Sequence, residues 1–260
     1  ETEHNVTLTR GFFLGKYEVT QAEYQAVMTG NTSGLSATPS QYNGNPDRPV
    51  ERVSWDDIQI FLDRLNSQES NNTAAGWKYA LPTEAEWEYA CRAGTYTPHY
   101  WGNSPDTSYA NYPSSGYNQT QDIGQYPSNQ WGFYDMSGNV FEWVNDWRTS
   151  YSSDSVIDPE GPDSSSQRVF RGGAFSQPSG YLRSAARPGS IPSQTTNWLG
   201  FRLALRQVSL PPTDLNSTAP LTIAENQPIG TIVGEFNATD PDENATLTYH
   251  LVSGVGDDNN

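Results

Sequence analysis

The chain has 260 residues, with 14 Lys and Arg against 30 Asp and Glu, which gives a formal net charge of −16. This balance argues against nucleic-acid binding, because a protein that contacts the phosphate backbone needs a basic face. Aromatic residues reach 12%, which is too many for a disordered chain, and the length predicts one or two domains.

The sequence also limits membrane and cysteine chemistry. No apolar run approaches the roughly 18–20 residues of a membrane span, so no membrane insertion is expected. The first residues, Glu1 to His4, lack the basic and apolar segments of a signal peptide, so the chain is either cytosolic or has lost its signal. The single cysteine, Cys91, excludes an intramolecular disulfide and a zinc site built from several thiolates.

Capping boxes predict three helices in the first 95 residues. The first helix follows Thr20 and ends near Met28, the second follows Ser54, and the third follows Thr83 and ends near Arg92. The second carries an apolar stripe at i, i+3, i+4 and i+7, formed by Ile58, Phe61, Leu62 and Leu65. One face of this helix is therefore expected to pack against a core.

The rest of the first 207 residues mixes loops with short strands. Cys91 lies one helical turn after Trp87, so we interpret it as a small buried hydrophobic residue rather than a reactive thiol. From residue 95 to Gly132 the composition predicts a long ordered loop or short strands, whereas 168–171 and 200–206 alternate as strands do. Helices with several short strands indicate an α+β fold.

Composition shifts near residue 207 and predicts three segments. Residues 1–207 form the first domain, and 208–218 form a linker that contains Pro211 and Pro212. Residues 219–260 have strand-like runs separated by turns, which predicts part of a β-sandwich. A segment of this length buries too little surface to be stable alone, so we expect it to belong to a longer protein.

Six segments of the first domain carry family-specific motifs in order. They are 15–20, 49–55, 81–90, 132–143, 168–173 and 199–202. Together they resemble the formylglycine-generating enzyme (sulfatase-modifying factor) family over about residues 8–206. The resemblance implies a C-type-lectin-like fold of the α+β class.

The same resemblance bears on copper. Formylglycine-generating enzymes oxidise a sulfatase cysteine with copper held by two cysteines after an Arg-Gly-Gly strand. Alignment of that motif here places Gln177 and Leu182 at the two cysteine positions. Neither residue replaces a thiolate, which is the ligand type that Cu(I) requires. The resemblance therefore implies a domain without copper and without oxidase activity, and an enzyme of this family is the alternative.

Calcium is the cofactor that the resemblance favours. In the family a Gly-Asn-x-x-Glu element binds calcium through main-chain carbonyls and a carboxylate. The resemblance assigns the carbonyls to Asn139 and Val140 and the carboxylate to Glu142. A second family site begins at an element that matches Asn111 and Tyr112. Oxygen ligands are those that Ca²⁺ takes.

Two other kinds of site, a glycosidase carboxylate pair and a histidine iron site, have little support in the sequence. A glycosidase pair drawn from Asp135, Glu142 and Asp146 has no sequence feature that fixes the separation of the carboxylates. Family relatives that bind iron use histidines, but His4, His99 and His250 stand in unrelated contexts, so structural or solvated roles are expected for all three.

The segment after Arg-Gly-Gly is the predicted binding surface. It resembles the variable segment of retroelement-diversified ligand-binding proteins, in which changed side chains contact the ligand. Phe175 and Leu182 are expected in the core. The expected surface residues are Ser176, Gln177, Tyr181, Arg183 and Trp198. An alternative is that Arg183 and Arg187 only form ion pairs with the abundant carboxylates.

The C-terminal segment resembles the first half of a bacterial cadherin repeat. Cadherin repeats bind calcium through acidic residues, so Glu225, Asp240 and Asp242 are ligand candidates. The alternative is a turn without metal, because Asp-Pro-Asp also initiates turns.

These observations predict a noncatalytic binding or structural module in an extracellular or cell-surface bacterial protein. The net charge favours a neutral or cationic partner: a glycan, a protein or another copy of the chain. A building block of a fibre or surface layer is a further alternative.

Overall fold

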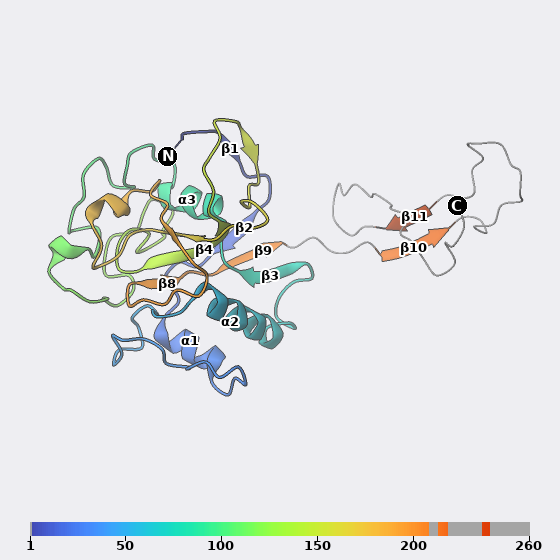
Figure 1. Ribbon diagram of the computed structural model, residues 1–260, viewed down its shortest axis with the longest axis horizontal. Helices are drawn as coiled ribbons and strands as arrows, with labels where there is room; N and C mark the ends of the chain where they lie inside the picture. The colour runs from blue at the N-terminus through green and yellow to red at the C-terminus, as the bar shows by residue number, and fades with distance from the viewer. Residues whose placement is uncertain (1, 208–212, 218–235, 240–260) are drawn as a thin grey trace, which may run out of the picture. The chain divides into compact units, whose positions relative to one another are not determined.

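The computed structural model describes residues 2–207, 213–217 and 236–239. The chain divides into two units, Glu1–Gln207 and Val208–Asn260, and the division falls where the composition shifts (Figure 1). In the second unit, β10 (Thr213–Ser217) pairs with β11 (Phe236–Thr239) in antiparallel orientation. Most of the proposed linker from 208 to 218 is therefore strand or outside the described residues, and the cadherin-like repeat falls largely outside them.

The three predicted helices are confirmed. They are α1 (Gln21–Met28), α2 (Trp55–Gln68) and α3 (Glu84–Arg92), and both hydrogen bonds of each capping box are present at Thr20, Ser54 and Thr83. In each box the N-cap hydroxyl accepts a backbone N–H three residues later, at 3.0–3.2 Å. These bonds satisfy amides that a helix start leaves unpaired, which explains why the local sequence fixes each start.

Two sheets form the centre of the first unit. The larger has the strand order β7 (Gly189–Ser190), β6 (Arg168–Arg171), β4 (Phe141–Trp147) and β8 (Leu199–Phe201). The smaller has the order β2 (Phe12–Leu14), β9 (Ala204–Gln207) and β3 (Trp77–Ala80). A short parallel pair, β1 (Val6–Thr7) with β5 (Val156–Ile157), lies apart from both sheets.

The single strand predicted over 200–206 is wrong. The chain leaves β8, which is parallel to β4, and enters β9, which lies between β2 and β3. The break falls at Arg202 and Leu203, where the Arg202 side chain is fully buried against Glu142. An alternating pattern does not reveal that two halves of a run belong to different sheets.

Both faces of the larger sheet are buried. On one face, Phe141, Trp143 and Phe170 pack in a cluster with residues of α1 and α2. On the other face, Val144 and Val169 pack in a cluster with Trp87 and Cys91 of α3. Successive strand residues point to opposite faces, so one strand serves two core clusters. In the view of Figure 1, α1 and α2 lie on one side of these strands and α3 on the other.

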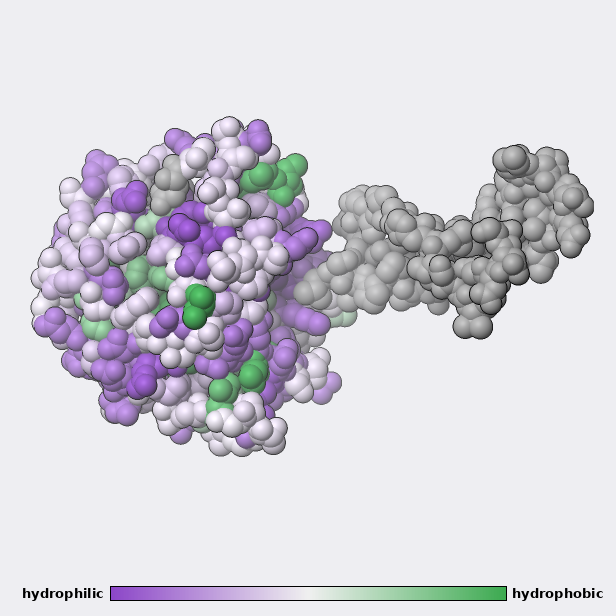
Figure 2. Space-filling model, in the orientation of Figure 1, coloured by the Kyte–Doolittle hydropathy of each residue, from purple (hydrophilic) through white to green (hydrophobic). Residues whose placement is uncertain are grey.

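Loops cover the rest of the first unit. Between α3 and β4 the described chain contains one short 3-10 helix, η1 (Pro113–Ser115), as the composition predicts. A second, η2 (Ser179–Leu182), follows β6. Among the described residues, no helix has the length and apolar character needed to cross a membrane. Figure 2 shows a largely hydrophilic face on this unit, with hydrophobic residues in small separate groups.

Candidate ligand-binding site

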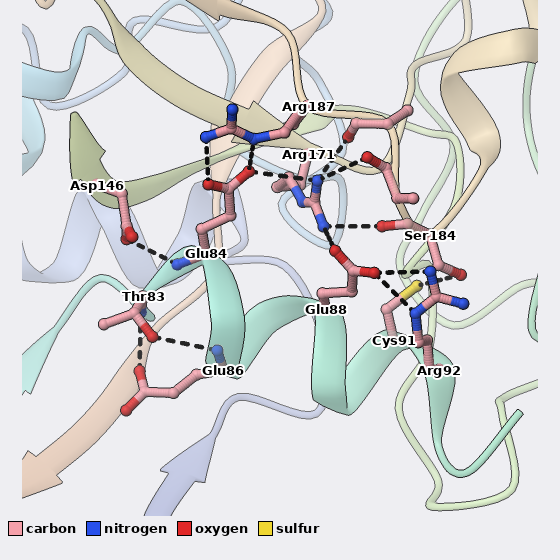
Figure 3. Close-up of polar contacts among 12 residues, drawn as sticks. Thr83, Glu84, Glu86, Glu88, Cys91, Arg92, Asp146, Arg171, Ser184 and Arg187 are labelled. Carbon is pink, nitrogen blue, oxygen red and sulfur yellow. Dashed lines mark hydrogen bonds and ion pairs between the residues drawn. The ribbon is translucent and has the colours of Figure 1, made fainter. Parts of the chain in front are cut away.

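The N-terminus of α3 begins a buried network of charges (Figure 3). The Glu84 backbone N–H donates to Asp146 Oδ2 at 2.7 Å, and the Glu84 carboxylate accepts from Nε and Nη2 of Arg187, each at 2.7 Å. Burial would raise the pKa of Glu84, but the hydrogen bonds and charges of Arg187 and Arg171 hold it below its usual value. A paired carboxylate of this kind stays ionised in the interior.

Arg171, at the end of β6, extends this network to the chain that follows η2. Its guanidinium lies 3.3 Å from Glu84 and forms an ion pair with Glu88, which in turn pairs with Arg92. It also donates to three consecutive main-chain carbonyls, those of Ser184, Ala185 and Ala186 (Figure 3). The segment after Arg-Gly-Gly is thus attached to α3 by one buried arginine.

The two glycines after Arg171 shape the same segment. Gly173 has a φ of +82°, and a Cβ there would lie 2.9 Å from Leu182 Cδ2. Leu182 is 1% exposed and Phe175 is also buried, as predicted. Leu182 occupies one of the positions that the family resemblance assigns to copper cysteines, and a buried aliphatic side chain has no atom that could bind copper.

Cys91 is buried beneath this segment, as predicted. Its Sγ lies 3.5 Å from Ser184 Oγ and 3.7 Å from the Met136 carbonyl. Burial raises the pKa of the Cys91 thiol to about 12, so the thiolate needed for nucleophilic or metal chemistry is disfavoured. Neither the buried Cys91 thiol nor the residues at the two family copper positions, Gln177 and Leu182, fit a copper site.

A cleft of about 610 Å³ lies on the outer side of the segment. Its lining residues are Arg148, Gln167, Pro178, Gly180, Tyr181, Arg183, Ala186, Arg187, Pro188 and Gly189. A cleft of this volume accommodates a ligand of one to a few rings. A smaller depression of about 300 Å³ also contains Arg148 and Arg187 in its wall.

The structure brings only part of the predicted binding surface into this cleft. Tyr181 and Arg183 line it, but Ser176, Gln177 and Trp198 do not. Trp198 is half-buried and packs on the core, with its ring 5.6 Å from that of Phe141. Trp198 therefore lies outside the cleft, and its role as a binding residue stays a prediction. The sequence does not show which face of the chain Trp198 occupies.

Arg187 forms the ion pair that its alternative role predicts, although it also lines the cleft. Its guanidinium pairs with Glu84 and lies over the Tyr151 ring, 3.9 Å from the centroid. Arg183 donates from Nε to the Gly180 carbonyl at 3.1 Å. Arg148 and Gln167 were not predicted as lining residues. They lie just beyond β4 and just before β6, and only the antiparallel pairing of these strands brings them to the cleft.

The carboxylate of Glu142 does not match its predicted role as a calcium ligand. Both of its oxygens accept from Arg202, at 2.7 and 3.0 Å, and Oε2 also accepts from Trp87 Nε1 at 2.7 Å. A cation bound to this carboxylate would face the Arg202 guanidinium, which repels it. The sequence did not show this pair because its members are far apart along the chain.

The other predicted calcium residues lie in a buried polar cluster. Asn111 donates to Asn139 Oδ1 at 3.4 Å, and Asn139 donates to Glu18 Oε2 at 2.8 Å. The Val140 backbone N–H donates to Glu18 Oε1, and the Tyr112 carbonyl accepts from Ser115. Burial, with the nearby charges of Asp135 and Glu142, raises the pKa of Glu18 well above its usual value. Sequence analysis missed Glu18, which lies in the first matched motif.

The remaining acidic and histidine residues occupy separate places. Asp135 accepts from the Gly124 N–H, and Asp146 accepts from Glu84, so neither faces the cleft. His99 is buried and its Nδ1 lies 3.2 Å from the Leu182 carbonyl, whereas His4 contacts Tyr151. Within residues 2–207 and the two described strands of the tail, no group of three His, Cys, Asp or Glu is arranged to hold a metal. His250, Glu225, Asp240 and Asp242 lie outside the described residues.

Capped helices, short-stranded sheets and a loop segment held on α3 define a mixed α/β domain of the formylglycine-generating-enzyme type. The family model described as the sulfatase-modifying factor enzyme 1-like domain matches residues 1–207. The chain belongs to this family.

Two curated relatives show the range of proteins that share the domain. The chain is 36% identical over 177 residues to a formylglycine-generating enzyme of Bos taurus, an alignment of 61% of this chain and 44% of the relative. It is 32% identical to the chaperone protein LppX of Paenibacillus barcinonensis, over 67% of this chain and 72% of the relative. The chain thus spans less than half the length of the bovine enzyme.

Solved structures agree with the fold. Treponema denticola variable protein 1 superimposes with a TM-score of 0.68 at 31% identity, over 78% of this chain and 87% of that one. PvdO from Pseudomonas aeruginosa gives 0.63 at 29% identity, over 77% and 82% of the respective chains.

Proposed function

We propose that residues 1–207 form a noncatalytic binding module and that the cleft beside Tyr181 is its binding surface. The observation that carries the proposal is the type of side chain found in the segment after Arg-Gly-Gly. Gln177 and Leu182 stand at the copper positions implied by the family, and the single thiol of the chain is buried in α3. Without an accessible thiolate, the segment is suited to contact a ligand rather than to oxidise one.

The fixed backbone around the cleft supports a binding role. Arg171 and Arg187 attach residues 184–187 to α3 through buried ion pairs and main-chain hydrogen bonds. A preformed surface loses little conformational freedom when a ligand binds, so more of the contact energy becomes affinity. A relative named as a chaperone protein also supports contact with another protein as a role of this domain.

The alternative is an enzyme of the family, and an aldehyde assay separates the two. The full chain is incubated with a Cys-containing sulfatase peptide, copper and oxygen, beside a formylglycine-generating enzyme as positive control. We expect no aldehyde above the level without protein. Stoichiometric aldehyde would overturn the noncatalytic proposal.

A binding assay tests the positive half of the proposal. The full chain and its Tyr181→Ala variant are applied to an array of neutral and acidic oligosaccharides and to immobilised copies of the chain. Tyr181 is 39% exposed, so its removal should preserve folding and weaken binding. The loss should be about 2 kcal/mol or more if Tyr181 is a main contact. Unchanged binding by the variant would place the functional surface elsewhere.

Calcium binding is a separate proposal. Its support is the oxygen-rich cluster of Asn111, Asn139 and Glu18, beside which the Thr120 hydroxyl is buried without a hydrogen-bond partner among the described residues. Amide, hydroxyl and carboxylate oxygens are ligands of Ca²⁺. If calcium binds the folded state alone, EDTA lowers the melting temperature. A Glu18→Gln variant should lose that response, and identical melting of the wild type with calcium and with EDTA would exclude the site.

We further propose an extracellular or cell-surface bacterial setting, with the cadherin-like segment and its acidic residues at 225, 240 and 242 as a second calcium-binding part. Self-assembly into a fibre or surface layer is the alternative use of the same cleft. Analytical ultracentrifugation with calcium present decides this point, because assembly predicts species that grow with protein concentration.

A further inference from the structure

The cleft has a positive wall in a chain whose net charge is −16. Three of its lining residues are arginines, at 148, 183 and 187, and acidic side chains are not among its lining residues. The depression next to it shares Arg148 and Arg187. Three of the 14 basic residues of the chain thus line the proposed binding surface, and no acidic side chain of the described residues does.

Arg148 is the arginine whose charge is left for a ligand. Its Nε donates to the Arg187 carbonyl at 3.3 Å, and within residues 2–207 no carboxylate forms an ion pair with it. Arg187, in contrast, donates from Nε and Nη2 to the two carboxylate oxygens of Glu84, so its charge is already paired. Because Arg148 immediately follows β4, its backbone is fixed while its guanidinium remains exposed.

The rest of the lining restricts the kind of ligand. The Tyr181 ring makes a T-shaped contact with Phe141, at 5.6 Å between centroids, and Tyr181 remains 39% exposed; Gln167 adds a side-chain amide to the lining. Leu, Ile, Val, Met and Phe are not among the lining residues. An aromatic face with polar groups around it suits a sugar ring. Among the described residues, the lining contains no large aliphatic side chain that would form a well-packed, desolvated pocket for a protein partner.

The neighbouring strand also disfavours an extended peptide. β7 forms the edge of the larger sheet beside the cleft, but it has two residues and follows Pro188, which has no N–H to donate. Strand addition depends on a row of free main-chain groups at a sheet edge. A peptide would therefore find few backbone partners here.

We propose that the cleft binds an acidic sugar, with a uronate carboxylate on Arg148 and the sugar ring on Tyr181. A guanidinium binds a carboxylate through two parallel hydrogen bonds, which gives orientation as well as charge. This inference rests on the proposed binding function and adds the class of ligand. A short acidic sugar, with one carboxylate per ring, also suits an acidic protein, whose overall field repels dense polyanions.

The test compares one sugar with and without its charge. Binding of trigalacturonate, its fully methyl-esterified form and a hexaglutamate peptide to the full chain is measured by isothermal titration calorimetry at low ionic strength. We expect the acid to bind at least tenfold more tightly than the ester, and the peptide to bind no better than the ester. Equal binding of acid and ester would keep the binding module but overturn the acidic-sugar proposal.

Matched variants locate the site. Arg148→Gln should weaken trigalacturonate binding at least tenfold and leave the ester unaffected. Lys78→Gln removes the same charge from an exposed position in β3 and should leave both sugars unaffected. Tyr181→Ala should weaken acid and ester alike. An Arg148→Gln variant that is folded and binds like the wild type overturns the proposal, as does tighter binding of hexaglutamate or no binding of trigalacturonate.

Discussion

At the scale of single residues, the first unit is unusual in how many carboxylates it buries. Glu18, Asp135 and Glu142 are each buried, and they share the single guanidinium of Arg202. Arg202 also donates to the carbonyls of Gly15 and Tyr134, so it joins the chain just after β2 to the loop before β4. One arginine thus balances a local excess of negative charge.

This arrangement predicts unequal effects for the two members of the Glu142–Arg202 pair. Arg202→Gln leaves the buried Glu142 carboxylate without its ion-pair partner and should lower the free energy of unfolding by about 3–5 kcal/mol. Glu142→Gln should cost clearly less, because Glu18 and Asp135 remain near Arg202. Urea unfolding at pH 7 measures both. Equal losses would show that Glu18 and Asp135 do not contribute to the balance.

Asp146 predicts a pH dependence of stability. Burial, and then the charge of Glu84, raises the pKa of Asp146 to about 7. Between about pH 4 and pH 7 the unfolded state therefore binds fewer protons than the folded state, and stability falls as pH rises. One proton corresponds to a slope of about 1.4 kcal/mol per pH unit.

Asp146→Asn removes this titration while its carbonyl oxygen still accepts the Glu84 N–H. We expect a shallower fall in the free energy of unfolding over that pH range, by up to about 1.4 kcal/mol per pH unit. Burial also raises the pKa of Glu51 to about 7, so part of the pH dependence of stability remains in the variant. Chemical denaturation at several pH values measures the difference, and parallel profiles would contradict a raised pKa at Asp146.

At the scale of elements, local signals and long-range contacts differ in how well sequence reveals them. Each helix start was predictable because its N-cap hydroxyl and the partner amide lie three residues apart. The pairing of Glu142 with Arg202, and the presence of Arg148 in the same cleft as Tyr181, were not predictable because strand pairing creates them. The family resemblance identified the domain, but it assigned Glu142 to calcium where the structure gives it to Arg202.

The same distinction explains the outcome for the binding surface. Tyr181 and Arg183 lie in the segment that follows Arg-Gly-Gly, so the sequence placed them where the cleft is found. Trp198 precedes β8, and its ring turns toward the core cluster. An aromatic residue in a loop gives no sequence signal that separates these two orientations, since both suit its large apolar ring.

Close packing of β8 against the chain before α2 gives a prediction for Gly200. A Cβ at this position would lie 2.3 Å from the Val50 carbonyl oxygen, which belongs to the backbone. Gly200→Ala should therefore lower the free energy of unfolding by about 1–3 kcal/mol. Gly180→Ala is the control, because a Cβ there has no heavy atom within 4 Å. Similar stabilities for the two variants, measured by urea unfolding, would contradict the close contact.

At the scale of the whole molecule, the described core belongs to the first unit. Its hydrophobic clusters draw on α1, α2, α3 and the larger sheet, all of which lie before residue 208. The last strand of the first unit, β9, lies in the middle of the smaller sheet, where Gln207 is paired with Trp77 of β3. A chain that ends after Gln207 therefore keeps both sheets complete.

We accordingly expect residues 1–207 to fold as an autonomous unit. Their melting temperature should lie within about 4 °C of the first transition of the full chain, a difference that corresponds to about 1 kcal/mol for a domain of this size. A chain that ends at Leu203 is the control. It lacks β9, so β2 and β3 lose their shared partner and the unit should fail to melt cooperatively. Differential scanning calorimetry measures all three chains. A much lower melting temperature for residues 1–207 would show that the second unit contributes to the stability of the first, because the strands and core clusters of the first unit are present in both chains.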